Sequence, residues 1–335
     1  MGLSKGIVCA NPCTSVFYFI LLFSLSSDSM LDSAHGYENT EVGSKLNDFN
    51  FVVAGDFGCG NEAKKTIGAM ASMKPELVMA LGDLAYRKNP ICWFNMIRPL
   101  ENNSKFKISF GEHDVTRSNL TYNQYLKHFN LTKPYYSFNY KNVHFLAMAT
   151  PKSKLIPYDA TSEQYQFVKN DLRLAHDNKS INWIIVYSFR PFYSSNTTHP
   201  AEEILRKDYH TLFDKYGVDV VLQAHNHNYQ RTYPITFNET SPMTPIPSDK
   251  DLQNFYKNPK GPIFITAGTG GAPLYIFSSQ APFVVSQFAQ NGFLNVDIEK
   301  SGKEYNLTGT FYKNNNLIKQ DYFIISKDNN RINGN

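Results

Sequence analysis

The sequence has little of several features that define common protein classes. It has only four Cys in 335 residues, so it is not a small domain held together by disulfides. Its basic residues occur only as isolated pairs, such as Lys64-Lys65 and Arg206-Lys207, and its formal net charge is only +4. Nucleic-acid binding usually requires a basic stripe, so we expect no nucleic-acid partner.

A long hydrophobic run is also missing. The apolar stretch 16–25 is about half the length of the roughly 20 residues that a membrane-spanning helix needs. We interpret residues 1–34 as a secretory signal peptide, cleaved near Ala34, and residues 35–46 as an N-terminal extension. This predicts a secreted or extracytoplasmic protein with no stable membrane span after signal removal. The alternative is an uncleaved helix that anchors the N-terminus in a membrane.

Removal of this segment would leave two cysteines, Cys59 and Cys92. In an oxidising compartment they could pair, but two free buried thiols fit the sequence equally well. Seven Asn-x-Ser/Thr sequons agree with export and predict a glycoprotein. They begin at Asn102, Asn119, Asn130, Asn178, Asn196, Asn238 and Asn306.

From residue 50 onward, short apolar runs alternate with segments of helical periodicity, which is typical of strands packed between helices. The expected strands are 51–55, 77–82, 106–111, 135–139, 143–149, 183–189, 218–224, 262–267, 293–298, 305–311 and 318–325. Thr161 and Gln164 resemble a capping box that starts one helix, and a second helix is expected over 201–216, ended by Gly217. We expect 238–260 to be a surface loop, 47–326 to be one domain and 327–335 to be a polar tail.

Polar residues of metal-ligand type follow strand after strand. Asp56, Asp83, Glu112 and the pair His225 and His227 each come just after an apolar run. The carboxyl ends of strands are where open α/β sheets assemble their sites. Carboxylates and imidazoles that converge there would repel or desolvate one another without a cation between them. Oxygen and nitrogen donors without thiolate suit Fe, Mn, Zn or similar ions.

These residues stand in five blocks that resemble the purple acid phosphatases, within the calcineurin-like metallophosphoesterases. The blocks are Gly55–Gly58, Gly82–Tyr86, Gly111–Asp114, Val186–Pro191 and Ala224–His227, and the resemblance covers about residues 49–326. It implies an α+β fold, a four-layer αββα sandwich of two mixed sheets flanked by helices. It also implies a first metal, Fe(III), held by Asp56, Asp83, Tyr86 and His227, all of which are present.

The second metal position departs from the family pattern. The family has an Asn and a His where this chain has Glu112 and Phe189, and Phe189 cannot bind a metal. Either Glu112 uses both oxygens to complete a second site, together with Asp83 and His225, or the site holds one metal or none. The second ion would be divalent, Fe, Mn, Zn or Mg, and the first alternative favours Mn or Mg over Zn.

The resemblance implies a secreted phosphatase that hydrolyses small phosphate monoesters by attack of a metal-bound hydroxide. His113 is the candidate to protonate the leaving group and Asp114 the candidate to orient it. His199 and Arg190 are the candidate substrate-binding residues, although Arg190 could instead pair with a site carboxylate. The alternative function is a weak or inactive protein of the same fold that binds metal or phosphate. The physiological substrate and the oligomeric state cannot be inferred from the sequence.

Overall fold

The structure is a computed structural model that describes residues 47–115, 119–250 and 254–328. The predicted signal peptide 1–34 and the extension 35–46 lie outside the described residues, as does 329–335 of the predicted tail.

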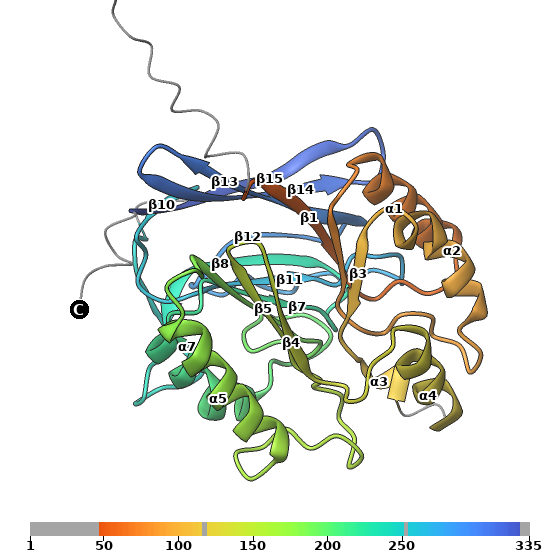
Figure 1. The fold of residues 1–335 in the computed structure, drawn as a ribbon, viewed down its shortest axis with the longest axis horizontal. Coiled ribbons are helices and arrows are strands. Elements are labelled where there is room, and N and C mark those ends of the chain that lie inside the picture. Colours follow the sequence, from red (N-terminus) through yellow and green to blue (C-terminus); the bar gives the residue numbers. More distant parts are fainter. Residues whose placement is uncertain (1–46, 116–118, 251–253, 329–335) are drawn as a thin grey trace, which may run out of the picture. The chain divides into compact units, whose positions relative to one another are not determined.

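Two mixed β-sheets form the centre of the fold (Figure 1). In the described residues the first sheet has seven strands in the order β10-β15-β14-β13-β1-β2-β3, with parallel pairing at β1-β2 and β2-β3 and antiparallel pairing from β1 to β15. Its strands are β1 (Phe49–Ala54), β2 (Leu77–Ala80), β3 (Lys105–Ile108), β10 (Phe255–Lys257), β13 (Gly292–Ser301), β14 (Glu304–Lys313) and β15 (Ile318–Asp328).

The second sheet has the order β12-β8-β11-β7-β6-β5-β4, with the short β9 paired to β8. Strands β5, β6, β7 and β11 run parallel, and β4, β8 and β12 pair antiparallel at its two sides. Its strands are β4 (Tyr136–Tyr140), β5 (Val143–Ala147), β6 (Trp183–Tyr187), β7 (Val220–Gln223), β8 (Tyr229–Thr236), β9 (Ile246–Pro247), β11 (Ile263–Ala267) and β12 (Val284–Phe288).

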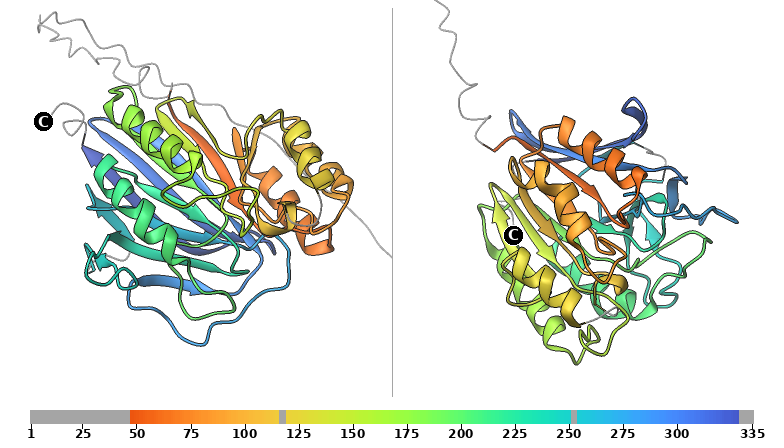
Figure 2. Two further views of the ribbon diagram at one scale, coloured as in Figure 1. Left: turned by 90° about the horizontal axis from the view of Figure 1, so that it is seen from below. Right: turned by 90° about the vertical axis from the view of Figure 1, so that its right-hand side faces the viewer.

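Three buried clusters create the four layers. In β1, Phe51 and Val53 point into the core between the sheets, whereas Val52 and Ala54 point to the outer helices. This follows from the strand period of two, which sends successive side chains to opposite faces. Helices α1 (Asn61–Ser72), α2 (Ile91–Glu101) and α4 (Asn119–His128) cover the first sheet. Helices α5 (Glu163–Asp177) and α7 (Thr211–Tyr216) lie side by side on the second (Figure 2). The expected αββα sandwich is therefore confirmed.

The second expected helix is interrupted. It consists of α6 (Glu203–Leu205), a π-helical segment η1 (Arg206–His210) and α7, which ends at Gly217 with a φ of 69°. The short α3 (Glu112–Val115) completes the helices of the described residues. None of these helices has the length and apolar character needed to cross a membrane.

Three local predictions need correction. Ser162, not Thr161, caps α5: its Oγ accepts a hydrogen bond from the Tyr165 N–H, and the Gln164 side chain instead bonds the backbone of Ala149. The expected loop 238–260 contains β9 and β10. Strand β15 continues to Asp328, two residues into the expected tail.

Candidate metal centre

The predicted site residues lie where strands end. Asp56 follows β1, Asp83 follows β2, Glu112 follows β3, and His225 follows β7. Asp56 bridges the two sheets because its Oδ2 accepts the His225 backbone N–H at 2.9 Å. The site therefore sits between the carboxyl ends of strands from both sheets, as expected from the sequence.

Four of the predicted ligands have strained backbones. Asp56, Asp83, Tyr86 and His225 adopt φ values of 57°, 48°, 54° and 70°. Non-glycine residues rarely adopt positive φ, at a cost of order 1–3 kcal/mol each, and such residues cluster at functional sites. The fold thus tolerates strain at the residues that the sequence marks as functional.

Close approach of two loops explains one glycine of the site. Gly82 has a φ of 94°, and a Cβ atom there would lie 2.7 Å from the Gly111 backbone nitrogen. Only glycine fits both constraints. This approach brings the Asp83 loop against the loop that starts at Gly111, and the Asp83 Oδ1 accepts the His113 backbone N–H at 2.8 Å.

Asp56, Tyr86 and His227 form a tight triangle of donor atoms. The Tyr86 hydroxyl lies 2.8 Å from Asp56 Oδ1 and 2.9 Å from His227 Nε2, and His227 Nε2 lies 3.3 Å from Asp56 Oδ1. Metal–ligand bonds of about 2.1 Å at right angles would place neighbouring donors about 3 Å apart. The triangle therefore has the dimensions of one face of a coordination octahedron.

The orientation of His227 makes this triangle suitable for a cation. Its Nδ1 lies 2.7 Å from the Pro273 carbonyl oxygen, so Nδ1 must be the protonated donor. Its Nε2, which carries either a proton or a lone pair, then faces the oxygens of Asp56 and Tyr86. Burial lowers the pKa of His227, but Asp56 outweighs this and the net shift is upward, so this position attracts positive charge.

The remaining charges also call for a cation. Burial, with the charges of Asp114 and Asp56, raises the pKa of Asp83 well above its ordinary value. Burial, with Asp56 and Asp83, likewise raises the pKa of Tyr86. In the described residues, His, Cys, Asp and Glu alone form no group of three or more that could hold a metal. Tyrosine is the third member of this triangle, so the donors present fit a metal only when Tyr86 is counted.

His113 and Asp114 lie beside this triangle. The His113 ring is 4.6 Å from that of Tyr86, and its Nε2 is 3.8 Å from Asp83 Oδ2. Its side chain is 40% exposed. Asp114 is buried, and its two oxygens accept the backbone N–H groups of Leu84 and Gly111. These contacts support the loops, and the orientation of His113 by Asp114 stays a prediction.

Arg190 pairs with carboxylates. Its Nε and Nη2 both donate to Oε1 of Glu112, and its Nη1 donates to Glu202. Oε1 of Glu112 also accepts the Lys152 backbone N–H at 3.2 Å, which leaves Oε2 toward His225 Nδ1, 3.5 Å away. In this structure Arg190 therefore pairs with a site carboxylate, which is the second of the two alternatives. Its guanidinium is bound by both Glu112 and Glu202.

The His225 ring packs against both Phe189 and His199 on the second side of the site. The His225 ring lies 4.9 Å from that of Phe189 and 4.1 Å from that of His199, with which it is stacked. Burial and the nearby Arg190 lower the pKa of His225 to about 2, so its ring is neutral. Phe189 offers no donor here, so a second ion would have fewer ligands than the first.

Two residues missed by the sequence reasoning also shape the site. The Tyr275 ring stacks on His227 at 4.0 Å, and its backbone N–H donates to the His227 carbonyl. Asn226 is buried and holds the backbone of His199 at both its N–H and its carbonyl. Asn226 stands between His225 and His227 in the sequence, which was the available signal. Tyr275 follows the Gly-rich segment 268–271, and no sequence signal there indicated its role.

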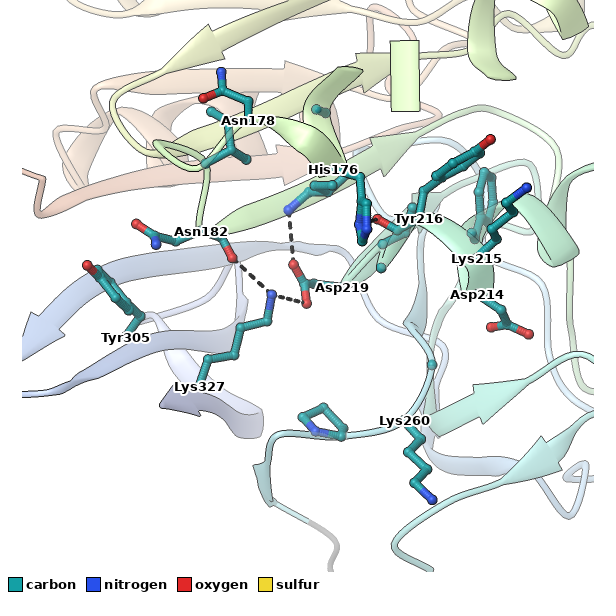
Figure 3. Close-up of a pocket in the computed structure, with 18 of the residues that line it drawn as sticks. His176, Asn178, Asn182, Asp214, Lys215, Tyr216, Asp219, Lys260, Tyr305 and Lys327 are labelled. Atoms are coloured by element: carbon teal, nitrogen blue, oxygen red, sulfur yellow. Dashed lines mark hydrogen bonds and ion pairs between the residues drawn. The ribbon is translucent and has the colours of Figure 1, made fainter. Parts of the chain in front are cut away.

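A cavity of about 480 Å³ lies elsewhere (Figure 3). It is at the amino ends of β6 and β7, where Lys327 donates to Asp219 and to the Asn182 carbonyl. The Asp219 Oδ2 in turn accepts the Ile184 backbone N–H. These groups satisfy one another and join β15 to the second sheet, so their contacts are structural.

The two cysteines left after the predicted signal are joined by a disulfide. The Cα atoms of Cys59 and Cys92 lie 6.0 Å apart, with 33 residues of separation along the chain. The closed loop includes Asp83 and Tyr86. The disulfide therefore settles the open alternative in favour of pairing, and it ties down the segment that supplies half of the first-site residues.

The family comparison agrees with this geometry. The family profile described as calcineurin-like phosphoesterase matches residues 49–229, and the chain belongs to this family. Within the family it is similar to purple acid phosphatases. Purple acid phosphatase 21 of Arabidopsis thaliana is 28% identical over 268 residues, covering 72% of this chain and 55% of the relative. The chain thus spans about half the length of the curated relatives it matches.

Two solved structures share the fold. Purple acid phosphatase PPD1 from yellow lupin (Lupinus luteus) seeds superposes with a TM-score of 0.68 at 22% identity, covering 86% of this chain and 55% of that one. GAP50, described as the anchor in the inner membrane complex of Plasmodium, superposes with a TM-score of 0.62 at 15% identity, covering 85% and 92%. At these identities the likeness concerns the fold alone.

Proposed function

We propose that the chain is a metal-dependent phosphatase that hydrolyses small phosphate monoesters. The observation that supports this most is the triangle of Asp56, Tyr86 and His227, whose donor spacing suits a cation. The family match supports the reaction class.

The first ion would be held by Asp56, Tyr86 and His227 with Asp83 beside them, and we propose Fe(III). Three anionic oxygens would balance its charge. Because these groups are buried, water solvates their charges poorly, which favours binding of a cation. A cation bound there would supply a Lewis acid and make a bound water much more acidic.

The second half of the site differs from the first. Glu112 and His225 are its candidate ligands for a divalent ion, Fe, Mn, Zn or Mg, but Arg190 holds one oxygen of Glu112. We propose that Arg190 supplies the positive charge there, and that a second ion binds only when Arg190 moves away. Glu112 would then bind the ion through both carboxylate oxygens, because the Phe189 side chain has no donor atom.

The protein side chains would divide the remaining work. His113 is partly exposed next to Tyr86 and would donate a proton to the leaving alkoxide. His199, held by Asn226 and stacked on His225, would contact the substrate from the opposite side. Burial lowers the pKa of His199, which favours its neutral, hydrogen-bonding form.

Hydrolysis of p-nitrophenyl phosphate from pH 4 to 8, with metal content measured on the same sample, tests this function. We expect turnover that is lost in His227→Gln and retained in the control His128→Gln, whose side chain pairs with Glu101 on another face. Bound metal with no turnover would contradict the phosphatase proposal and favour the alternative, a metal-binding or phosphate-binding protein of this fold.

Export through the predicted signal 1–34 belongs to the same proposal. A disulfide between Cys59 and Cys92 is the kind of bond that persists in oxidising compartments. The sequon side chains Asn102, Asn119, Asn130, Asn178 and Asn196 are exposed, which glycosylation requires. Secretion of the full chain from a eukaryotic host, with a mass shift on glycosidase treatment, would test both predictions.

A further inference from the structure

Arg206 is a buried cation without an acidic partner in the described residues. It is 3% exposed, and its side chain makes one hydrogen bond, from Nη1 to the Phe192 carbonyl at 2.8 Å. Its Nε is buried and has no acceptor. The guanidinium lies 5.7 Å from the centre of the Tyr193 ring. Since buried charges in proteins are normally paired, this arrangement calls for an anion that the protein itself does not provide.

The local backbone places this cation. Arg206 is the first residue of the π-helical segment η1, a rare conformation that occurs frequently at functional sites. Burial lowers the pKa of Arg206, and the nearby Tyr193, Glu203 and Glu202 offset this only in part.

Arg206 lines a cavity of about 220 Å³. The other walls include the polar side chains of Ser194, Asn196 and Thr197 and the apolar side chain of Phe283. Whole small-molecule sites are usually about 300–1,000 Å³, so this cavity suits one end of a molecule. Its one unpaired charge is positive, and the group it would receive is anionic.

The cavity adjoins the candidate metal centre. His199 lines it, and the His199 ring stacks on that of His225 at 4.1 Å. Asn226 links the cavity to the metal centre. It stands between His225 and His227 in the sequence, and its Nδ2 lies 3.0 Å both from Ser194 Oγ and from the His199 carbonyl, which belong to cavity residues. A substrate bound at the centre could therefore extend past His199 toward Arg206.

We propose that this cavity receives a second anionic group, a carboxylate or a phosphate, on the leaving-group side of the substrate. The inference rests on the proposed phosphatase function and names its substrate class: phosphate monoesters whose alcohol part bears another acid. Arg206 would pair with that acid through charge-assisted hydrogen bonds, and the hydroxyl groups of the cavity would surround it.

The test compares kcat/KM for phenyl phosphate, 4-carboxyphenyl phosphate and 1,4-phenylene bisphosphate. We expect the wild-type protein to prefer at least one acid-bearing ester by about tenfold or more, with the two esters distinguishing carboxylate from phosphate. Arg206→Met should remove most of that preference. The control Lys207→Met should retain it, because Lys207 is 54% exposed and pairs with Glu203. No preference in the wild-type protein, or a preference unchanged in Arg206→Met, would overturn the proposal.

Benzoate binding separates this inference from the proposed function. Calorimetry should show benzoate binding even if no ester is hydrolysed, with affinity reduced about tenfold or more in Arg206→Met and unchanged in Lys207→Met. If Arg206→Met does not fold, a crystal structure of the wild-type protein with benzoate replaces it. A carboxylate within hydrogen-bond distance of Arg206 would support the proposal. Absence of benzoate and, in a parallel structure, of inorganic phosphate from this cavity would overturn it.

Discussion

Arg190 donates to one oxygen of Glu112 through both Nε and Nη2. The resemblance in sequence implies that Glu112 replaces a neutral Asn of the family and that Phe189, just before Arg190, replaces a His. The carboxylate and guanidinium compensate each other in a half-buried site. The pair therefore accounts for a negative charge that a second metal would otherwise have to neutralise.

Removal of the Arg190 charge should improve binding of a second ion. In Arg190→Met, the guanidinium no longer holds Oε1 of Glu112, so we expect Mn²⁺ to bind at a second site about tenfold or more tightly than in the wild-type protein. Calorimetric titration of protein already loaded at the first site measures this. Arg173→Met, which removes an exposed partner of Asp177, is the matched control. Equal second-site affinity in Arg190→Met and the wild-type protein would contradict this account of the pair.

Tyr86 should give the iron-loaded protein its colour. A tyrosinate bound to Fe(III) absorbs visible light by charge transfer, and the Tyr86 hydroxyl lies within 3 Å of both Asp56 Oδ1 and His227 Nε2. We expect Tyr86→Phe to lose the visible band, while the control Tyr322→Phe, on β15 and 41% exposed, keeps it. A band of unchanged intensity in iron-loaded Tyr86→Phe would exclude this ligand.

Asp114 should make the metal-free protein less stable as the pH rises. Burial raises its pKa from 3.8 to about 7. The folded state therefore holds the proton more tightly than the unfolded state. The stability from this group is fully present below about pH 4 and is lost as the pH approaches 7, at up to about 1.4 kcal/mol per pH unit.

Urea unfolding of metal-free protein at several pH values measures this loss. Asp114→Asn should flatten the pH dependence, although the amide also loses one backbone hydrogen bond. The control Asp177→Asn, at an exposed carboxylate, should keep the wild-type slope. An Asp114→Asn slope equal to that of the wild-type protein would show that another group causes the effect.

The disulfide should contribute strongly to the free energy of unfolding. A bond that closes a loop with a separation of 33 residues is worth about 3–4 kcal/mol in the chain-entropy model. We expect the double variant Cys59→Ser with Cys92→Ser to lose roughly this amount in chemical denaturation. Reductant should destabilise the wild-type protein but leave the double variant unaffected. Equal stability of oxidised and reduced wild-type protein would contradict this prediction.

Much of the fold and of the first site could be predicted from the sequence because both depend on local patterns. Buried parallel strands are continuous apolar runs, and the polar residue that follows each run is visible without a structure. The strands before Asp56, Asp83 and His225 are of this kind, and the structure brings their polar ends together as expected.

Strand β8 shows why other parts were missed. It contains buried Gln230 and Arg231 and a proline, Pro234, so it lacks the apolar run that marks a strand. Arg231 is acceptable there because Asp321, 90 residues away, pairs with it. The Arg190 and Glu112 pair is non-local in the same way, with its members 78 positions apart in the sequence. Such partners depend on tertiary packing, which local sequence does not reveal.

The metal content of the purified protein tests the central claim most directly. Plasma mass spectrometry should find about one iron ion per chain in the wild-type protein and in His128→Gln. His227→Gln should lose most of the iron, because it removes one corner of the triangle with Asp56 and Tyr86. A wild-type protein that binds no metal when supplied with iron, or a His227→Gln variant that retains the full content, would contradict the account.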